Sequence, residues 1–166
     1  LWANPAYDIT NAFSALTNNS ANYYPSMAAF SAKGAKTAAY MCTSTGSSQT
    51  CYFDDEDSMT NILKGENIEL KGYYEIPESG DANFITEVNS AVAQAKTDDV
   101  DLMIIHDYGD LCVQGGLSME SSGWTPKGFY LVVCGSKSSV LSAMGKTAYY
   151  VTAYTPWTSS GEYSSS

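Results

Sequence analysis

The spacing of hydrophobic and polar positions alternates along the chain between segments typical of strands and segments typical of helices. Four apolar runs predict buried strands, and a fifth segment, 68–76, alternates between apolar and polar positions as a half-buried strand does. Segments with helical spacing lie between these runs. The predicted strands span 36–44, 68–76, 100–107, 127–135 and 147–155, and the predicted helices span 21–34, 55–65, 79–99, 109–123 and 136–145.

The first predicted helix contains a proline and ends at a glycine. Pro25 is compatible with the first turn of a helix, where its missing N–H has no helical partner to lose. Gly34 has the position of a C-cap glycine, which adopts the left-handed backbone at little cost. The apolar residues expected near one face are Tyr24, Met27, Ala28 and Phe30.

The second and third predicted helices carry clearer signals. The acidic run 54–57 begins the second helix, where Asp54 or Asp55 can act as the N-cap and negative charge suits the helix dipole. We favour this interpretation over a metal site, because the run lacks the spacing of a calcium-binding loop. The third helix has an apolar stripe at helical spacing, formed by Phe84, Val88, Ala91, Val92 and Ala95.

The regular alternation of helices and strands predicts one α/β unit. Apolar strands joined by helices indicate a three-layer α/β/α fold with a mostly parallel sheet of about five strands. In such a sheet, ligands bind beyond the carboxyl ends of the strands. We divide the chain into an entry segment (1–20), a single lobe (21–157) and a flexible tail (158–166). The segments expected at the carboxyl edge are 43–52, 75–79, 106–110 and 134–137.

The composition of the chain limits the kinds of molecule that it is expected to bind. The 166 residues are 44% hydrophobic, and 18 acids against 8 lysines, with no arginine, give a net charge of −10. This balance argues against nucleic acid as a partner. A ligand is expected to be neutral, cationic or metal-bound rather than multiply anionic. No apolar run reaches the roughly 18 residues that a membrane-spanning helix needs, so no direct membrane insertion is expected.

Four cysteines suggest an oxidising compartment. None of them forms a CxxC pair, so zinc binding is disfavoured and two disulfides are the natural interpretation, with three connectivities open. The start of the chain, without methionine, is typical of a processed end or a fragment. Asn18 begins a glycosylation sequon, although Asn19 or Ser20 can instead cap the helix that follows.

One enzymatic interpretation is a cysteine peptidase. His106 ends one predicted strand and Cys134 ends a later one, a layout that resembles caspase-like peptidases. Asp107 follows the histidine, however, where that family typically has glycine, and an even cysteine count makes Cys134 a disulfide partner. No phosphate-binding loop, dinucleotide fingerprint or nucleophile elbow is present, and no cofactor is expected.

The ordered set of segments resembles the second lobe of type I periplasmic binding proteins and related receptor ligand-binding domains, the leucine-isoleucine-valine-binding-protein-like family. The segments that carry the resemblance are "NAFSALTNNSANYYPSMAAFSAKGAKTAAYMCTST", "NIELKGYYEIPESGDANFITEVNSAVAQAKTDDVDLMIIHDYGD", "QGGLSMESSGWTPKGFYLVV" and "VLSAMGKTAYYVTAYTPW". Together they cover roughly residues 5 to 157. The resemblance implies a bilobed protein in which closure about a hinge traps a ligand between the lobes.

The resemblance also suggests contact positions. Tyr52 lies where the family places an aromatic residue after the first strand of this lobe, and Tyr108 lies where another contact follows the third strand. The acid that amino-acid binders often carry near Val133 or Cys134 is absent, which disfavours an amino acid as ligand. The ligand contacts expected on this edge are Tyr52, Asp107, Tyr108, Gly135 and Ser136.

These patterns lead to one leading hypothesis with two alternatives. The chain is expected to be a secreted, extracellular or cell-surface ligand-binding lobe without catalytic activity, whose cleft is completed by a first lobe or a neighbouring subunit. The first alternative is a structural surface or filament subunit that forms homo-oligomers, and the second is the hydrolase based on His106 and Cys134. The expected disulfides are Cys42–Cys51, which closes a short loop, and Cys112–Cys134, at neighbouring strand ends.

Overall fold

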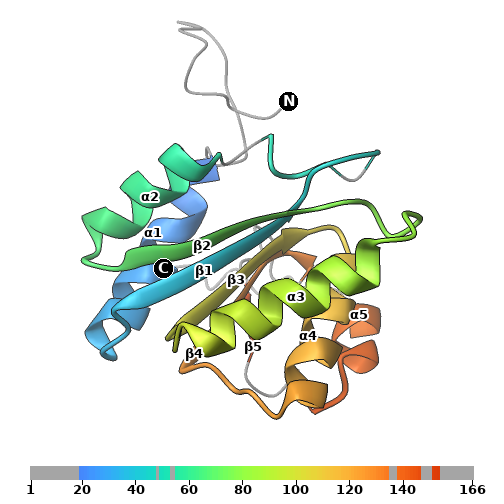
Figure 1. Ribbon diagram of the computed structural model, residues 1–166. Helices are drawn as coiled ribbons and strands as arrows, with labels where there is room; N and C mark the ends of the chain where they lie inside the picture. Colours follow the sequence, from blue (N-terminus) through green and yellow to red (C-terminus); the bar gives the residue numbers. More distant parts are fainter. Residues whose placement is uncertain (1–18, 48, 53–54, 135–137, 147–150, 154–166) are drawn as a thin grey trace, which may run out of the picture.

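A computed structural model describes residues 19–47, 49–52, 55–134, 138–146 and 151–153 as a layered α/β unit (Figure 1). Helices and strands alternate strictly along these residues. The strands are β1 (Thr37–Thr43), β2 (Glu69–Ile76), β3 (Leu102–Asp107), β4 (Gly128–Val133) and β5 (Val151–Ala153). The helices are α1 (Asn19–Ala32), α2 (Glu56–Gly65), α3 (Phe84–Thr97), α4 (Asp110–Ser122) and α5 (Ser138–Ala143).

The strands form one five-stranded sheet with the order β2-β1-β3-β4-β5, and every neighbouring pair is parallel. The register aligns the strand ends, since Thr43 pairs with Ile76 and Asp107 pairs with Val133. β3 is the central strand, and all of its residues are buried. The predicted fold class and the two-faced burial of this strand are therefore confirmed.

Two cores cover the two faces of the sheet. Odd-numbered residues of the central strands, such as Met41 and Ile105, pack with α3, α4 and α5 in one core. Even-numbered residues, such as Tyr40 and Ile104, pack with α1 and α2 in the other. Figure 1 shows the same division, with α1 and α2 on one side of the sheet and α3, α4 and α5 on the other. Burial of alternate side chains on both faces explains the continuous apolar runs of the sequence.

α1 differs from its prediction in phase and in where it begins. The predicted Met27 is fully buried and Phe30 packs against the same core, but Tyr24 and Ala28 are exposed and Tyr23 is buried in place of Tyr24. Pro25 lies inside the helix, six residues after its first residue, rather than in the first turn. It removes one helical hydrogen bond, a cost that the buried Tyr23 and Met27 side chains offset.

Three other local predictions are confirmed. Gly34 has φ of +92° and follows the end of α1, as a C-cap glycine should. Asp55 is the N-cap of α2, and its carboxylate accepts a hydrogen bond from the Ser58 backbone N–H at 2.8 Å. A hydrogen bond from the Ser58 side chain, together with this backbone bond, holds the pKa of Asp55 below its usual value. The predicted apolar stripe of α3 is buried along its whole length.

None of the helices in the described part of the chain is both long and apolar enough to cross a membrane.

Candidate functional site

The topology of the sheet singles out the space beyond β1 and β3. From β1 the chain passes through α2 on one face to β2, then through α3 on the other face to β3 on the opposite side of β1. The connections after β1 and β3 therefore leave the sheet in opposite directions, which opens a crevice at the carboxyl edge. In open α/β sheets this switch point is where ligands bind.

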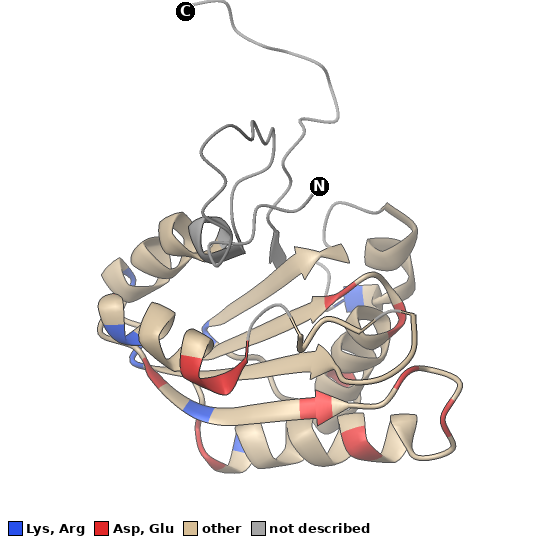
Figure 2. Cartoon of the chain, turned by 90° about the horizontal axis from the view of Figure 1, so that it is seen from above, with Lys and Arg blue, Asp and Glu red and all other residues tan. Residues whose placement is uncertain are grey.

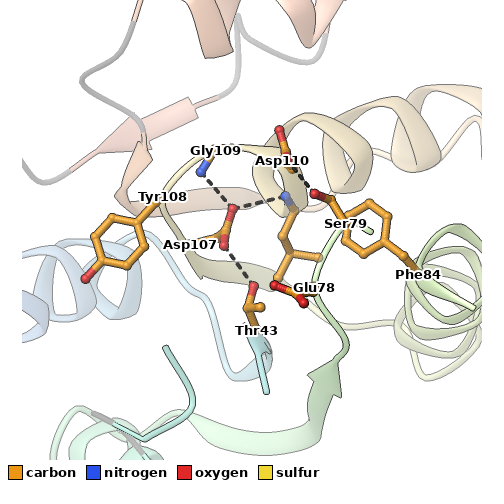
Figure 3. Close-up of a pocket in the computed structure, with 9 residues that line it drawn as sticks. Thr43, Glu78, Ser79, Phe84, Asp107, Tyr108, Gly109 and Asp110 are labelled. Carbon is orange, nitrogen blue, oxygen red and sulfur yellow. Dashed lines mark hydrogen bonds between the residues drawn. The ribbon is translucent and has the colours of Figure 1, made fainter. Parts of the chain in front are cut away.

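A pocket of about 190 Å³ lies at this position. Its walls come from the carboxyl end of β1, the loop after β2, the first residue of α3, and the turn between β3 and α4 (Figure 3). The lining residues are Thr43, Glu78, Ser79, Phe84, Asp107, Tyr108, Gly109, Asp110 and Leu111.

Asp107 joins two of these walls. Its side chain is only 3% exposed. One carboxylate oxygen accepts the Thr43 hydroxyl at 2.8 Å, and the other accepts the backbone N–H groups of Gly109 at 2.7 Å and Leu111 at 3.0 Å. The carboxylate thus connects the end of β1 to the first turn of α4, where the helix dipole also favours a negative charge.

Tyr108 and Asp110 follow Asp107 on the rim of the pocket. The Tyr108 ring is half-buried, and burial, together with the nearby Asp107 carboxylate, raises the pKa of its hydroxyl. Asp110 accepts a hydrogen bond from the Ser79 hydroxyl at 2.6 Å, which links the β3–α4 turn to the loop after β2. In Figure 3, Asp110 and Ser79 point toward each other, whereas the Tyr108 ring extends away from Asp107 and from the other labelled side chains.

The pocket is acidic. Three of its lining residues are carboxylates, Glu78, Asp107 and Asp110, and none is a lysine. Figure 2 shows further acidic residues on the arrowhead of β2 and in the loop that follows it. No group of three or more histidine, cysteine or acidic side chains in the described residues is arranged to hold a metal ion.

His106 lies beneath this edge rather than on it. It is 4% exposed, and its Nδ1 atom lies 3.0 Å from the Tyr40 hydroxyl and 3.2 Å from the Tyr23 hydroxyl. Its carbonyl accepts the Thr50 hydroxyl. These contacts tie α1, β1 and the β1–α2 loop to β3, so the histidine has a structural position.

The loop after β1 folds back on its own strand. Thr50 donates its backbone N–H to the Thr43 carbonyl at 2.8 Å, and a disulfide joins Cys42 to Cys51. The next residue, Tyr52, is 78% exposed and does not line the pocket. This cross-link therefore holds the Thr43 end of β1 in place, and Tyr52 lies outside the pocket lining.

The second disulfide excludes the alternative hydrolase based on His106 and Cys134. Cys134 is bonded to Cys112, the third residue of α4, so its sulfur is not a thiolate and cannot act as a nucleophile. Both predicted disulfide pairings are present. The neighbouring Val133 has φ of +71°, an uncommon conformation for a β-branched residue.

The sequence patterns predicted the edge of the sheet that carries the pocket more accurately than they predicted the individual residues that line it. Asp107 and Tyr108 line the pocket, Tyr52 does not, and Gly135, Ser136 and the sequon residue Asn18 lie outside the described residues. Of the seven other lining positions, five lie within the segments predicted for this edge: Thr43, Glu78, Ser79, Gly109 and Asp110. Phe84 was predicted only as part of the apolar stripe of the third helix, and Leu111 only as part of the fourth helix. The signal that identifies such residues is a polar side chain one to three positions after a strand.

Comparisons with known proteins give structural likenesses only. No protein-family model matches the chain, and no curated protein matches it. A substrate-binding protein of an ABC transporter from Aeropyrum pernix superposes with a TM-score of 0.65 at 16% identity, over 85% of this chain and 35% of that one. An extracellular ligand-binding receptor from Rhodopseudomonas palustris HaA2 superposes with a TM-score of 0.56 at 16% identity, over 74% of this chain and 31% of that one.

A leucine-binding protein from Thermotoga maritima MSB8 gives a TM-score of 0.53 at 15% identity, over 76% of this chain and 34% of that one. The chain thus spans about a third of the length of these structures. At such low identity the likeness carries information on the fold. The described residues have the α/β fold of one lobe of a type I periplasmic binding protein.

Proposed function

We propose that this chain is a ligand-binding lobe of a type I periplasmic-binding-protein-like protein, which binds a small molecule without chemical conversion. The observation that carries the proposal is the position of the pocket at the switch point between β1 and β3. The pocket of about 190 Å³ accommodates only part of a ligand, since small-molecule sites usually measure roughly 300–1,000 Å³. A second surface, from a first lobe or a neighbouring subunit, is proposed to complete the cleft.

The lining favours a neutral or cationic ligand. An anion would have to approach Glu78 and Asp110 in a pocket where no described lysine offers compensation. Buried charges that are not paired are costly, so anionic ligands are disfavoured here. A polar neutral molecule or an ammonium group is instead compatible with the carboxylate oxygens and with the Ser79 and Thr43 hydroxyls.

The proposed location is outside the cytoplasm. Both disulfides lie in the same unit and leave no free cysteine in it, which is typical of proteins of oxidising compartments. The structural neighbours include a protein described as an extracellular ligand-binding receptor. Both observations support secretion.

A thermal-shift screen tests the proposal. The purified chain is heated with neutral, cationic and anionic small molecules, and a ligand that binds the folded state raises the melting temperature. Replacing Ser79 by Trp should fill the pocket and abolish the shift, whereas the control Ser90→Trp, on the exposed face of α3, should retain it. A shift that survives Ser79→Trp, or one given by anions alone, would refute the proposed site.

A further inference from the structure

We infer that Asp107 is the positioning residue of the pocket, and that it acts through its three hydrogen bonds rather than by charge contact with a ligand. The inference rests on the proposed function of the same site. It changes the role of a residue that the sequence suggested as a direct contact.

The hydrogen bonds of Asp107 account for both of its oxygens. Thr43 occupies one oxygen, and Gly109 and Leu111 occupy the other. A carboxylate has lone pairs on both oxygens, and here each oxygen already accepts at least one short bond in a nearly water-free position. Three of the roughly four acceptor sites of the carboxylate are therefore occupied, which leaves little capacity to accept a hydrogen bond from a ligand.

The bonds also set the rim of the pocket. Gly109 is the N-cap of α4 and Leu111 is the second residue of this helix, and the bonds from their N–H groups hold the turn that carries Tyr108 and Asp110. Gly109, the N-cap of α4, makes no side-chain cap of its own, so the carboxylate two residues earlier satisfies the N–H groups instead. Losing these bonds should loosen the rim even when no ligand is present.

Replacement by asparagine separates geometry from charge. In Asp107→Asn the amide oxygen can accept from Gly109 and Leu111, and the amide N–H can donate to the Thr43 hydroxyl, which then accepts. The three contacts survive while the negative charge is lost. Asp107→Ala removes the contacts and the charge together.

Amide hydrogen exchange of the unliganded chain provides the first readout. We expect Asp107→Ala to speed exchange at Gly109 and Leu111 by at least about tenfold, and Asp107→Asn by less than about threefold. Thr43→Val, which removes one contact, should give an intermediate increase that Thr43→Ser restores. This second pair keeps the test valid if Asp107→Ala does not fold. Unchanged exchange in Asp107→Ala, or in Thr43→Val where Asp107→Ala does not fold, would overturn the inference.

Binding of n-butylammonium, followed by chemical-shift titration, provides the second readout. We expect Asp107→Asn to bind this probe within about threefold of the wild type, and Asp107→Ala to bind at least about tenfold more weakly. Equal loss in both variants, with normal exchange in Asp107→Asn, would show direct charge contact and overturn the inference. If the wild type binds no probe, the proposed function fails, and the exchange experiment alone decides the role of Asp107.

Discussion

The hydroxyl of Tyr40, on β1, lies 3.0 Å from Nδ1 of His106, on the neighbouring strand β3. Tyr23 of α1 brings its own hydroxyl to the same nitrogen at 3.2 Å. Three elements thus meet at one buried polar atom, directly below the strand ends that form the pocket. Buried polar groups of this kind stabilise the structure when they are satisfied and are costly when a partner is lost.

Removing the Tyr40 hydroxyl should destabilise the fold measurably. Tyr40→Phe keeps the ring that stacks on Tyr73 but deletes the bond to His106. The free energy of unfolding should fall by about 1 kcal/mol, as measured by urea denaturation. The control Tyr24→Phe, at an exposed position of α1, should change it by less than about 0.5 kcal/mol. Equal effects of the two substitutions would contradict a structural role for this contact.

Replacement by alanine at Gly34 and at Gly65 should change the free energy of unfolding in opposite directions. Neither Gly34 nor Gly65 has any atom within 4 Å of an added Cβ, but only Gly34 has a positive φ. Gly34→Ala should therefore lower the free energy of unfolding by about 1–2 kcal/mol. Gly65→Ala, at the end of α2, should raise it by roughly 0.5 kcal/mol. Thermal unfolding of both variants checks the sign, and stabilisation by Gly34→Ala would contradict the left-handed backbone at the C-cap of α1.

At the amino edge of the sheet, Asp101 bridges neighbouring elements as Asp107 does at the carboxyl edge. Its carboxylate accepts the Lys36 backbone N–H at 2.7 Å and lies 2.6 Å from the Lys127 ammonium. Burial raises the pKa of Asp101, but the hydrogen bonds from Lys127 and Lys36 outweigh it and bring the pKa below the ordinary value of 3.8. Because the pKa of Asp101 is lower in the folded protein than in the unfolded chain, the ionised carboxylate stabilises the fold at pH values above the ordinary pKa.

Asp101→Asn should consequently be less stable than the wild type at pH 7, by about 1 kcal/mol, because the charged acceptor is lost. The wild type loses this advantage as the pH falls below about 4, so the two stabilities should converge there. Urea denaturation across a pH series measures the difference. The neighbouring Asp99→Asn, at a left-handed position that asparagine tolerates, provides the control. A difference that stays constant with pH would contradict the charge-based account.

The two disulfides should stabilise the fold to different extents. Cys112–Cys134 spans 22 residues, whereas Cys42–Cys51 spans 9. On the chain-entropy model, replacing Cys112 and Cys134 together by alanine should cost about 3 kcal/mol, roughly 0.8 kcal/mol more than the same change at the shorter loop. Calorimetry of both double variants tests this order, and peptide mapping without reduction checks the pairings themselves.

The sequence predicted the periodic features well, and it predicted less well where residues far apart in the chain decide the outcome. The buried runs identified β3 because burial on both faces leaves a continuous apolar signature. Tyr23 and Tyr24 are adjacent and identical, so helical periodicity alone could not tell which one faces the core. The hydroxyl partners Tyr40 and His106 select Tyr23, and they are distant in sequence.

The same limit applies to the site. Asp107 could be placed at a strand end from the pattern, but its bond to Thr43 joins residues 64 positions apart. Glu78 and Ser79 belong to a loop without periodicity, so only the sheet order shows which pocket they face. Tyr52 was expected in the cleft, yet the Cys42–Cys51 loop leaves it outside the pocket lining.

Chemical-shift mapping on the isotope-labelled chain tests the central claim, small-molecule binding at the switch point, most directly. Titration with n-butylammonium and n-butanol should shift the amide signals of Thr43, Glu78, Ser79 and residues 107–111, and butyrate should leave them unchanged. Shifts confined to a different groove, the one beside Trp124 and Phe129, would contradict the claim, as would a stronger response to butyrate.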